Sequence, residues 1–213
     1  MTHRTFDLAL VGCGRISKNH FDAIARTDGL RLGAVCDVDE ARAREAGEAY
    51  GVPWFTSLDE LLKSARCDIV ALCTPSGLHA PQGVLAARAG KHVLSEKPMA
   101  TTLAAADDLV EACDAAGVHL FVVKQNRLNP PIQLLRRAVD KGRFGRIYLA
   151  NVTVRWQRPQ DYYDAAPWRG TWEFDGGAIM NQASHYVDLL QWLVGPVESV
   201  VAKTATQARH IEA

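Results

Sequence analysis

The chain has 213 residues, of which 48% are hydrophobic and 23% charged, and its 24 basic residues balance its 24 acidic ones. This composition is typical of a globular domain and excludes the disordered and fibrous classes. Without a net positive charge the sequence offers no global field for a nucleic acid, although a site for a small anion needs only local charge. The length suits one large domain or two small ones.

Strand-like and helix-like segments alternate regularly in the first part of the chain. Apolar runs predict strands at 6–11, 32–36, 53–55, 68–74, 92–95 and 119–123. Helices are expected at 16–27, 39–50, 79–89 and 102–116, and Ser57 with Glu60 forms a capping-box pattern. Continuous rather than alternating apolar strands indicate a sheet that is covered on both faces. Residues 1–123 are therefore predicted to form a Rossmann-type, doubly wound parallel α/β sheet.

From residue 124 the pattern changes. Helices are expected at 130–141 and 179–194, with an aromatic, glycine-rich loop at 158–178 between them. Segments 147–157 and 197–206 alternate between apolar and polar residues, as half-exposed antiparallel strands do. Residues 124–213 are predicted to begin an α+β domain. Because two strands rarely make a stable sheet, we expect this domain to be truncated or to pair with another subunit.

The five cysteines show neither a CxxC motif nor a Cys/His ligand spacing. Cys13, Cys36 and Cys73 lie in or beside apolar runs, which favours buried free thiols over disulfides or metal ligands. The amino terminus runs into the first apolar segment without a signal-peptide pattern, and no apolar run approaches the length of a membrane span. We expect a cytoplasmic protein that uses no metal.

A glycine motif stands where the first predicted strand meets the first helix. Gly12 would allow the tight turn, Gly14 would let the backbone approach a pyrophosphate, and Ser17 supplies a small residue at the helix–strand contact. The helix start at Arg15 and Ile16 would offer free N–H groups and a positive dipole end to the phosphates. A plain glycine-rich turn is the alternative.

Polar residues also follow other predicted strands. Asp37 ends the second strand, where a carboxylate can bind both ribose hydroxyls of adenosine and repel a 2′-phosphate, which favours NAD over NADP. A turn or a helix cap is the alternative for this residue. Thr74, Pro75 and His79 follow the fourth strand at the edge where doubly wound sheets bind ligands, although a simple turn with Ser76 as cap fits equally well.

Two residues are candidates for acid–base chemistry. Lys97 lies with Glu96 at the end of the fifth strand, where it would accept a proton from, or donate a hydrogen bond to, an alcohol that loses a hydride. A solvated loop lysine is the alternative. On a regular helix Asn181, His185 and Asp188 share one face, so His185 would act as general base or hold the reacting hydroxyl, with Asp188 orienting it. An ordinary structural histidine is the alternative there.

Together these residues resemble one known family, the glucose–fructose oxidoreductase / inositol dehydrogenase (Gfo/Idh/MocA) family, over essentially the whole chain. The matching motifs are the glycine motif, Asp37, Thr74-Pro75 with His79, Glu96-Lys97-Pro98, Trp168-Arg169 and Gly176-Gly177…His185-x-x-Asp188. The resemblance implies a Rossmann domain followed by an α+β domain with an open antiparallel sheet, and NAD(P) bound across the switch point. It makes Lys97 and His185 catalytic, and Trp168 and Arg169 cofactor contacts.

One departure from the family pattern concerns proton transfer. Many members carry an Asp where this chain has Asn181, so proton transfer is expected to depend more on Lys97 and His185. The family's chains are also longer, so the open sheet, which builds subunit contacts, is expected to be incomplete here. The peptide between Lys97 and Pro98 can be cis or trans, which the sequence does not decide.

A narrower resemblance joins segments 121–130, 158–164, 168–177 and 180–186 to the UDP-N-acetylglucosaminuronate 3-dehydrogenases of bacterial surface-polysaccharide (O-antigen) synthesis. It implies NAD-dependent oxidation of the sugar 3-hydroxyl to a ketone, with 2-oxoglutarate recycling NADH in some members, by a homo-oligomer. The implied substrate contacts are Lys97, Arg127, Tyr163, Asn181, Gln182 and His185. Lys124 and Gln125 would approach the nicotinamide ring, and Arg155 and Arg158 would bind the anionic sugar nucleotide.

Three hypotheses about function therefore stand. The first is the NAD-dependent sugar-nucleotide dehydrogenase. The second is a related sugar or inositol dehydrogenase, or an NAD-dependent glycosidase that oxidises its substrate transiently. The third is a non-catalytic NAD(H)-binding regulator, which the presence of both Lys97 and His185 disfavours.

Overall fold

The computed structural model describes residues 4–213. The chain divides into two compact units, Met1–Val123 and Lys124–Ala213. Among the described residues, every helix is too short or too polar to cross a membrane.

The first unit contains a six-stranded sheet in the order β3-β2-β1-β4-β5-β6, in which every neighbouring pair is parallel. The strands are β1 (Phe6–Val11), β2 (Leu30–Cys36), β3 (Trp54–Phe55), β4 (Ile69–Leu72), β5 (His92–Ser95) and β6 (Leu120–Val122). The order runs outward in opposite directions from β1 and β4, so the gap between these two strands is the topological switch point. This arrangement confirms the predicted doubly wound α/β fold.

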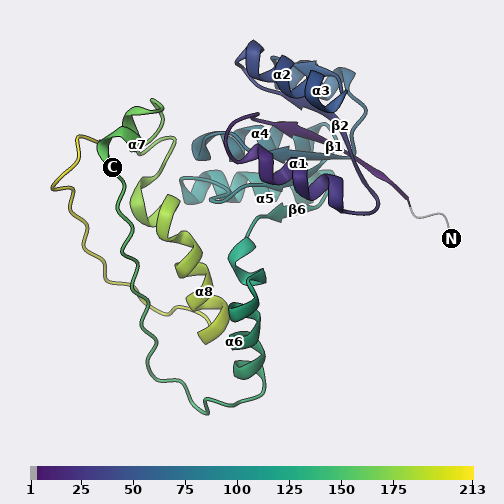
Figure 1. Ribbon diagram of the computed structural model, residues 1–213. Helices are drawn as coiled ribbons and strands as arrows, with labels where there is room; N and C mark the ends of the chain where they lie inside the picture. Colours follow the sequence, from purple (N-terminus) through teal and green to yellow (C-terminus); the bar gives the residue numbers. More distant parts are fainter. Residues whose placement is uncertain (1–3) are drawn as a thin grey trace. The chain divides into compact units, whose positions relative to one another are not determined.

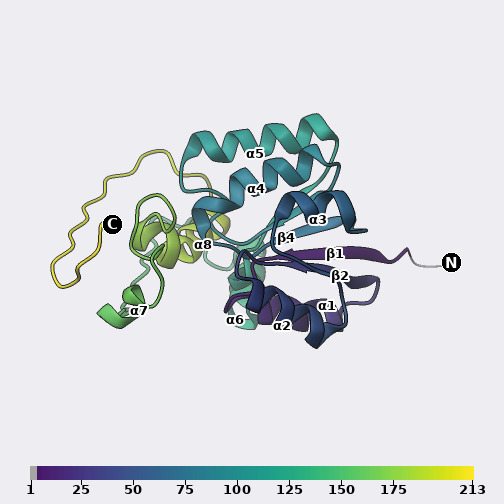
Figure 2. The same ribbon diagram turned by 90° about the horizontal axis from the view of Figure 1, so that it is seen from above.

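Helices cover both faces of this sheet (Figures 1 and 2). They are α1 (Ser17–Arg26), α2 (Glu40–Tyr50), α3 (Leu58–Ser64), α4 (Ser76–Arg88) and α5 (Leu103–Ala116). Alternate residues of β1 enter different cores: Leu8 and Leu10 pack with α1, whereas Ala9 and Val11 pack with α3, α4 and α5. A strand buried on both faces has to be apolar at every position, which is why the sequence shows continuous runs.

Local capping chemistry agrees with the sequence at some helix starts and not at others. Thr102 caps α5, since its side chain accepts from Ala105 N at 3.2 Å. Ser57 occupies the N-cap of α3 without a side-chain capping hydrogen bond, so the predicted capping box is wrong. Helix α4 begins at Ser76, earlier than predicted.

The second unit is helical. Its elements are the 3₁₀ turn η1 (Gln125–Leu128), α6 (Pro130–Asp140), α7 (Gln160–Asp164), the π-helix η2 (Ile179–Ala183) and α8 (Ser184–Val194). Helices α6 and α8 lie side by side (Figure 1), where Arg136 donates to the carbonyl of Trp192 and stacks 5.3 Å from its ring. The turn η1 and the short helix α7 were not anticipated from the sequence.

The two antiparallel strands predicted for residues 124–213 are not formed. Segments 147–157 and 197–206 belong to no ladder in the described structure, and Leu149 and Val201 are 75% and 96% exposed. A strand needs a partner for its N–H and C=O groups, and these two segments do not pair with each other.

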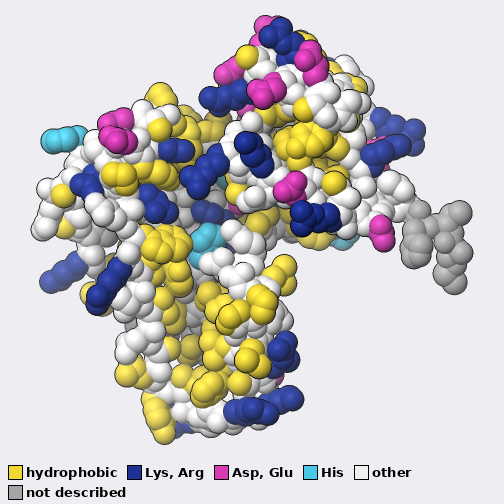
Figure 3. All heavy atoms as spheres, in the orientation of Figure 1, with side chains coloured by type: hydrophobic (Ala, Val, Ile, Leu, Met, Phe, Trp, Pro, Cys, Tyr) yellow, Lys and Arg dark blue, Asp and Glu magenta, His cyan; other side chains and the backbone are white. Residues whose placement is uncertain are grey.

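Leu189 is the one hydrophobic side chain of this unit in the buried core. Hydrophobic side chains also remain exposed over α6 and α8 (lower part of Figure 3).

All five cysteines are free. Cys36 and Cys73 are buried, as predicted, whereas Cys13 is half-buried on the glycine loop. Burial raises the pKa of Cys36 to about 11, so this thiol stays protonated and behaves as part of the core.

Candidate functional site

The glycine loop between β1 and α1 is shaped by the two glycines in different ways. Gly12 has a φ of 95°, and a Cβ at this position would lie 2.7 Å from the carbonyl carbon of Cys73. A Cβ on Gly14 would meet no described atom within 4 Å, so the backbone here faces open space, as the approach of a pyrophosphate requires. Ser17 is buried and donates to the carbonyl of Gly14 at 2.6 Å. Arg15 is exposed, and Ile16 is the N-cap residue of α1.

Asp37 fastens this loop to the end of β2. Its Oδ2 accepts from Cys13 N at 2.8 Å, and its Oδ1 accepts from Asp39 N at 2.9 Å. Each carboxylate oxygen has a second lone pair, so both remain able to accept a ribose hydroxyl. The hydrogen bonds to Cys13 and Asp39 bear out the turn-forming interpretation of Asp37, and its role as the ribose-binding carboxylate stays a prediction.

His79 joins two loops at the same sheet edge. It is 1% exposed, and its Nδ1 lies 2.7 Å from the carbonyl of Pro98 while its Nε2 lies 2.8 Å from the carbonyl of Thr74. Burial lowers the pKa of His79. Thr74 in turn donates from its hydroxyl to Gln82 at 2.7 Å, and Pro75 is the N-cap of α4. The side chain of His79 thus connects the end of β4 with the loop after β5.

Glu96 is the buried carboxylate of the loop after β5. Its Oε1 lies 2.8 Å from Nε2 of His20 in α1, and its Oε2 accepts from Lys97 N at 3.2 Å. Burial raises the pKa of Glu96, but the hydrogen bond from His20 and the charges of His20 and Lys97 outweigh it, so the pKa is lowered. Lys97 is half-buried and precedes a cis peptide to Pro98. His20 was missed in the sequence, where only its position one turn after Ser17 would have pointed to it.

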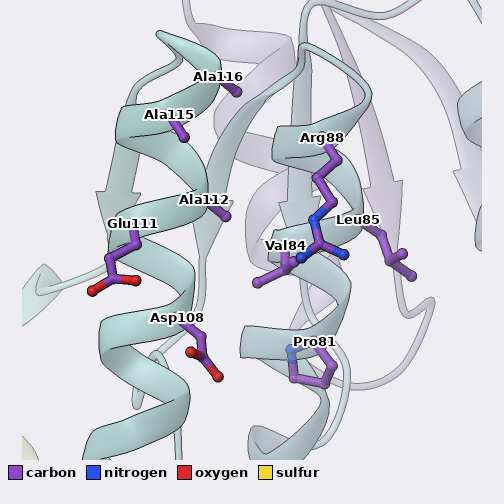
Figure 4. Close-up of a pocket in the computed structure, with 9 residues that line it drawn as sticks. All are labelled: Pro81, Val84, Leu85, Arg88, Asp108, Glu111, Ala112, Ala115 and Ala116. Carbon is purple, nitrogen blue, oxygen red and sulfur yellow. The ribbon is translucent and has the colours of Figure 1, made fainter.

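The predicted residues of the first unit therefore lie at the carboxyl ends of β1, β2, β4 and β5, on both sides of the switch point. A tight glycine turn, open space at Gly14 and an acceptor carboxylate at Asp37 fit the needs of a dinucleotide. A separate open groove of about 810 Å³ lies between α4 and α5 (Figure 4). None of the predicted site residues lines it.

In the second unit, Arg127 is bound to Asp188. The guanidinium donates from Nε at 2.8 Å and from Nη2 at 2.6 Å, and Lys124 Nζ lies 3.9 Å from the same carboxylate. The hydrogen bond to Asp188 raises the pKa of Arg127. The Asp188 side chain is only 9% exposed and holds Arg127 through both of its oxygens, while its predicted role in orienting His185 stays a prediction. Gln125, beside Lys124, is exposed.

Asn181 lies in the π-helix, not in the regular helix that the sequence indicated. The π-helix ends at Ala183 and His185 belongs to α8, so the two residues do not share one regular helix, and their common face stays a prediction. Asn181 donates from Nδ2 to Asp175, which is 3% exposed and also accepts from Gly170 N at 2.9 Å. Asp175 was missed because an Asp before two glycines is typical of a turn.

Aromatic rings and arginines surround the remaining predicted residues. Arg158 donates to Gln182 at 2.8 Å, and Gln182 donates to the hydroxyl of Tyr162 at 3.1 Å. Arg169 stacks 4.4 Å from the ring of Tyr162 and 5.6 Å from that of Trp168.

Two further predicted residues lie near this cluster in the sequence. Burial, and then the charge of Asp175, raise the pKa of Tyr163. His185 is half-buried in α8. Lys97 and His185 belong to different units, so their pairing stays a prediction.

Comparison with known families accounts for both units. Residues 6–124 match the Gfo/Idh/MocA oxidoreductase family, described as an NAD-binding Rossmann fold, and residues 132–213 match the Gfo/Idh/MocA C-terminal domain. Among curated relatives, D-apiose dehydrogenase of Paraburkholderia graminis is 33% identical over 205 residues, which are 96% of this chain and 54% of the relative. Inositol 2-dehydrogenase of Rhizobium meliloti is 31% identical over 98% of this chain and 60% of its own.

Two solved structures are more similar. The WlbA dehydrogenase of Bordetella pertussis, in complex with NADH and UDP-GlcNAcA, is 58% identical with a TM-score of 0.96 over 99% of this chain and 64% of its own. The WlbA dehydrogenase from Chromobacterium violaceum, in complex with the same two ligands, has the same identity and TM-score. This match covers 100% of this chain and 62% of the WlbA chain. The chain thus spans between half and two thirds of the length of these relatives.

Proposed function

Because this chain belongs to the Gfo/Idh/MocA family of oxidoreductases with an NAD-binding Rossmann fold, we propose that the protein oxidises the 3-hydroxyl of UDP-N-acetylglucosaminuronate to a ketone. The observation that carries the proposal is the 58% identity to two WlbA dehydrogenases that were crystallised with NADH and UDP-GlcNAcA. Residues 1–123 are the NAD-binding domain, and residues 124–213 begin the substrate domain.

The first unit binds NAD in this proposal. The loop at Gly12 and Gly14 and the start of α1 at Arg15 and Ile16 face the pyrophosphate, and Asp37 binds the adenosine ribose. Its negative charge repels a 2′-phosphate, which selects NAD over NADP. When bound, NAD accepts the hydride that leaves carbon 3 of the sugar.

The remaining predicted contacts to NAD divide between the two units. In the first unit they are Thr74 and Pro75 after β4, His79 in the first turn of α4, and Glu96 and Lys97 after β5. In the second unit they are Gln125, Trp168 and Arg169.

Lys97 and His185 handle the proton. As hydride departs, negative charge develops on the 3-oxygen of the sugar, and a nearby donor stabilises it. Lys97 and His185 are the residues that take the hydroxyl proton and hold the oxygen. Asn181 cannot accept a proton as a carboxylate would, so it contributes hydrogen bonds only.

The anionic substrate is bound by the second unit. Arg127, Arg155 and Arg158 supply positive charge for the uronate and the diphosphate, and Tyr163, Asn181 and Gln182 supply hydrogen bonds. Arg158 and Arg169 each bury an Nε that has no partner within the described structure, which is consistent with a polar ligand at these side chains.

The setting of the reaction is also part of the proposal. The enzyme works in the cytoplasm as a homo-oligomer and supplies a 3-keto sugar nucleotide for bacterial surface-polysaccharide synthesis, where an aminotransferase consumes the ketone. 2-Oxoglutarate reoxidises NADH.

Mass analysis of the product tests reaction type and substrate together. The protein expressed from its full gene is incubated with NAD, 2-oxoglutarate and UDP-N-acetylglucosaminuronate, and the sugar is expected to lose the mass of two hydrogen atoms. Lys97→Ala should abolish this loss while the circular dichroism spectrum stays unchanged. Turnover of free sugars or inositol instead of the UDP-sugar would favour the second hypothesis. Bound NAD that no polyol or sugar reduces would favour the regulator.

A further inference from the structure

His20 lies outside every motif that the sequence pointed to, yet it reaches the loop that carries Lys97. It stands on α1, the helix that follows the glycine loop, and its Nε2 lies 2.8 Å from Oε1 of Glu96. The two side chains are only 11% and 8% exposed, so water screens this contact poorly. Residues 76 positions apart in the sequence are thus joined at the sheet edge that binds the dinucleotide.

Glu96 uses its two oxygens in two directions. Oε1 faces His20, and Oε2 accepts from the backbone N–H of Lys97 at 3.2 Å. A carboxylate held at both oxygens cannot rotate freely, and the second bond fixes the backbone from which the Lys97 side chain extends. Two successive contacts, His20 with Glu96 and Glu96 with the backbone of Lys97, therefore connect α1 to Lys97.

The ionised form of Glu96, which holds the backbone of Lys97, depends on His20. Burial is the strongest influence on Glu96 and disfavours its ionised form, and His20 is the largest of the influences that oppose it. The other titratable groups that face Glu96 are Lys97 on its own loop, His79 from α4 and Cys73 after β4. Without His20, the carboxylate takes up a proton at a higher pH, and its hold on Lys97 weakens.

We propose that His20 and Glu96 are positioning residues, which hold the backbone of Lys97 beside the glycine loop so that its amine reaches the reacting hydroxyl. This proposal rests on the proposed role of Lys97 in the dehydrogenase reaction. Neither residue needs to touch the substrate, because the pair acts by holding the loop after β5 against α1.

Three variants test the pair in the protein expressed from its full gene, with NAD and UDP-N-acetylglucosaminuronate. His20→Leu removes the donor, His20→Gln restores an N–H at a comparable reach, and Glu96→Gln removes the charge. We expect His20→Leu to lower kcat by about 10- to 100-fold, the usual effect of a displaced catalytic group, with the KM for the sugar within about threefold. His20→Gln should recover most of the activity. Asp22→Leu, at an exposed position of the same helix, is the matched control.

The pH profile separates positioning from mere stability. In His20→Leu, kcat should fall on the acid side at a higher pH than in the wild type, because Glu96 has lost the hydrogen bond that lowers its pKa. The double variant His20→Leu with Glu96→Gln should lack that acid-side fall and be no slower than Glu96→Gln alone.

Two outcomes separate this proposal from the proposed function. If His20→Leu keeps the wild-type kcat and pH profile and only melts at a lower temperature, the pair is structural and the positioning proposal is overturned. If Lys97→Ala itself retains full turnover, the assigned role of Lys97 fails first.

Discussion

The carboxylate of Asp37 accepts a hydrogen bond from the backbone N–H of Cys13 at 2.8 Å, although the two residues are 24 positions apart. The end of β2 thereby holds the glycine loop at the end of β1. One carboxylate thus fixes the glycine loop, and each of its oxygens keeps a lone pair for a further donor. In the proposed function, loop order and the choice of cofactor therefore depend on the same side chain.

Asp37→Asn should weaken NADH binding and narrow the preference for NAD over NADP. The amide keeps one acceptor oxygen but turns an NH₂ group toward either Cys13 N or Asp39 N, and it removes the charge that repels a 2′-phosphate. We expect the Kd for NADH to rise by about tenfold, the cost of roughly one good hydrogen bond, and that for NADPH to fall. Fluorescence titration measures both, with Asp39→Asn as control. An unchanged ratio of the two constants would contradict the assignment.

The two glycines of the loop should separate stability from binding. In Gly12→Ala, the Cβ would lie 2.7 Å from the backbone of Cys73 at a φ of 95°, so we expect a loss of stability of about 1–3 kcal/mol or more. In Gly14→Ala the methyl group meets no described atom within 4 Å, so the melting temperature should change little while NADH affinity falls. Differential scanning calorimetry and NADH titration distinguish the two. Full NADH affinity in Gly14→Ala would argue against a pyrophosphate at this position.

Asp7 should contribute stability that depends on pH. It is 5% exposed in β1 and accepts from Nε and Nη2 of Arg31 at 2.6 and 2.9 Å. The hydrogen bond from Arg31 outweighs desolvation and lowers the pKa of Asp7 below its ordinary value of 3.8. A carboxyl group with a lowered folded-state pKa stabilises the fold fully above its unfolded pKa, and this contribution is lost as the pH falls through the folded value.

We therefore expect Asp7→Asn to lower the melting temperature at neutral pH by about 2–4 °C. The difference from the wild type should shrink as the pH falls below about 4. Thermal melts over a pH series measure this, with the exposed Asp28→Asn as control. A difference that stays constant down to acid pH would show that the lost interaction is not the ionised pair with Arg31.

Asp175→Asn should impair substrate binding more than cofactor binding. The wild-type carboxylate accepts from Gly170 N and from the amide of Asn181, whereas an introduced amide would turn a donor toward one of them. Because Asn181 is a proposed substrate contact, the KM for the UDP-sugar should rise by about tenfold. The Kd for NADH should stay the same. Steady-state kinetics and NADH titration measure these quantities, with the exposed Asp161→Asn as control. A lower melting temperature with unchanged KM would make Asp175 purely structural.

The sequence by itself determined the Rossmann unit and the place of its motifs. Continuous apolar runs such as 6–11 are a local property of strands buried on both faces. Because the carboxyl ends of parallel strands share one edge of the sheet, these runs also predict that Gly12, Asp37 and Lys97 lie at that edge. The spacing of these motifs also sufficed for the family resemblance, because each motif is a short run of adjacent residues.

Only the tertiary structure decided which side chains meet. His20 with Glu96 and Arg127 with Asp188 are 76 and 61 positions apart, and no local pattern joins them. The same reason explains the predicted strand at 147–157, which has the right alternation but forms no ladder. Alternation reports which face of a segment is apolar, whereas a strand exists only when a second strand satisfies its backbone hydrogen bonds.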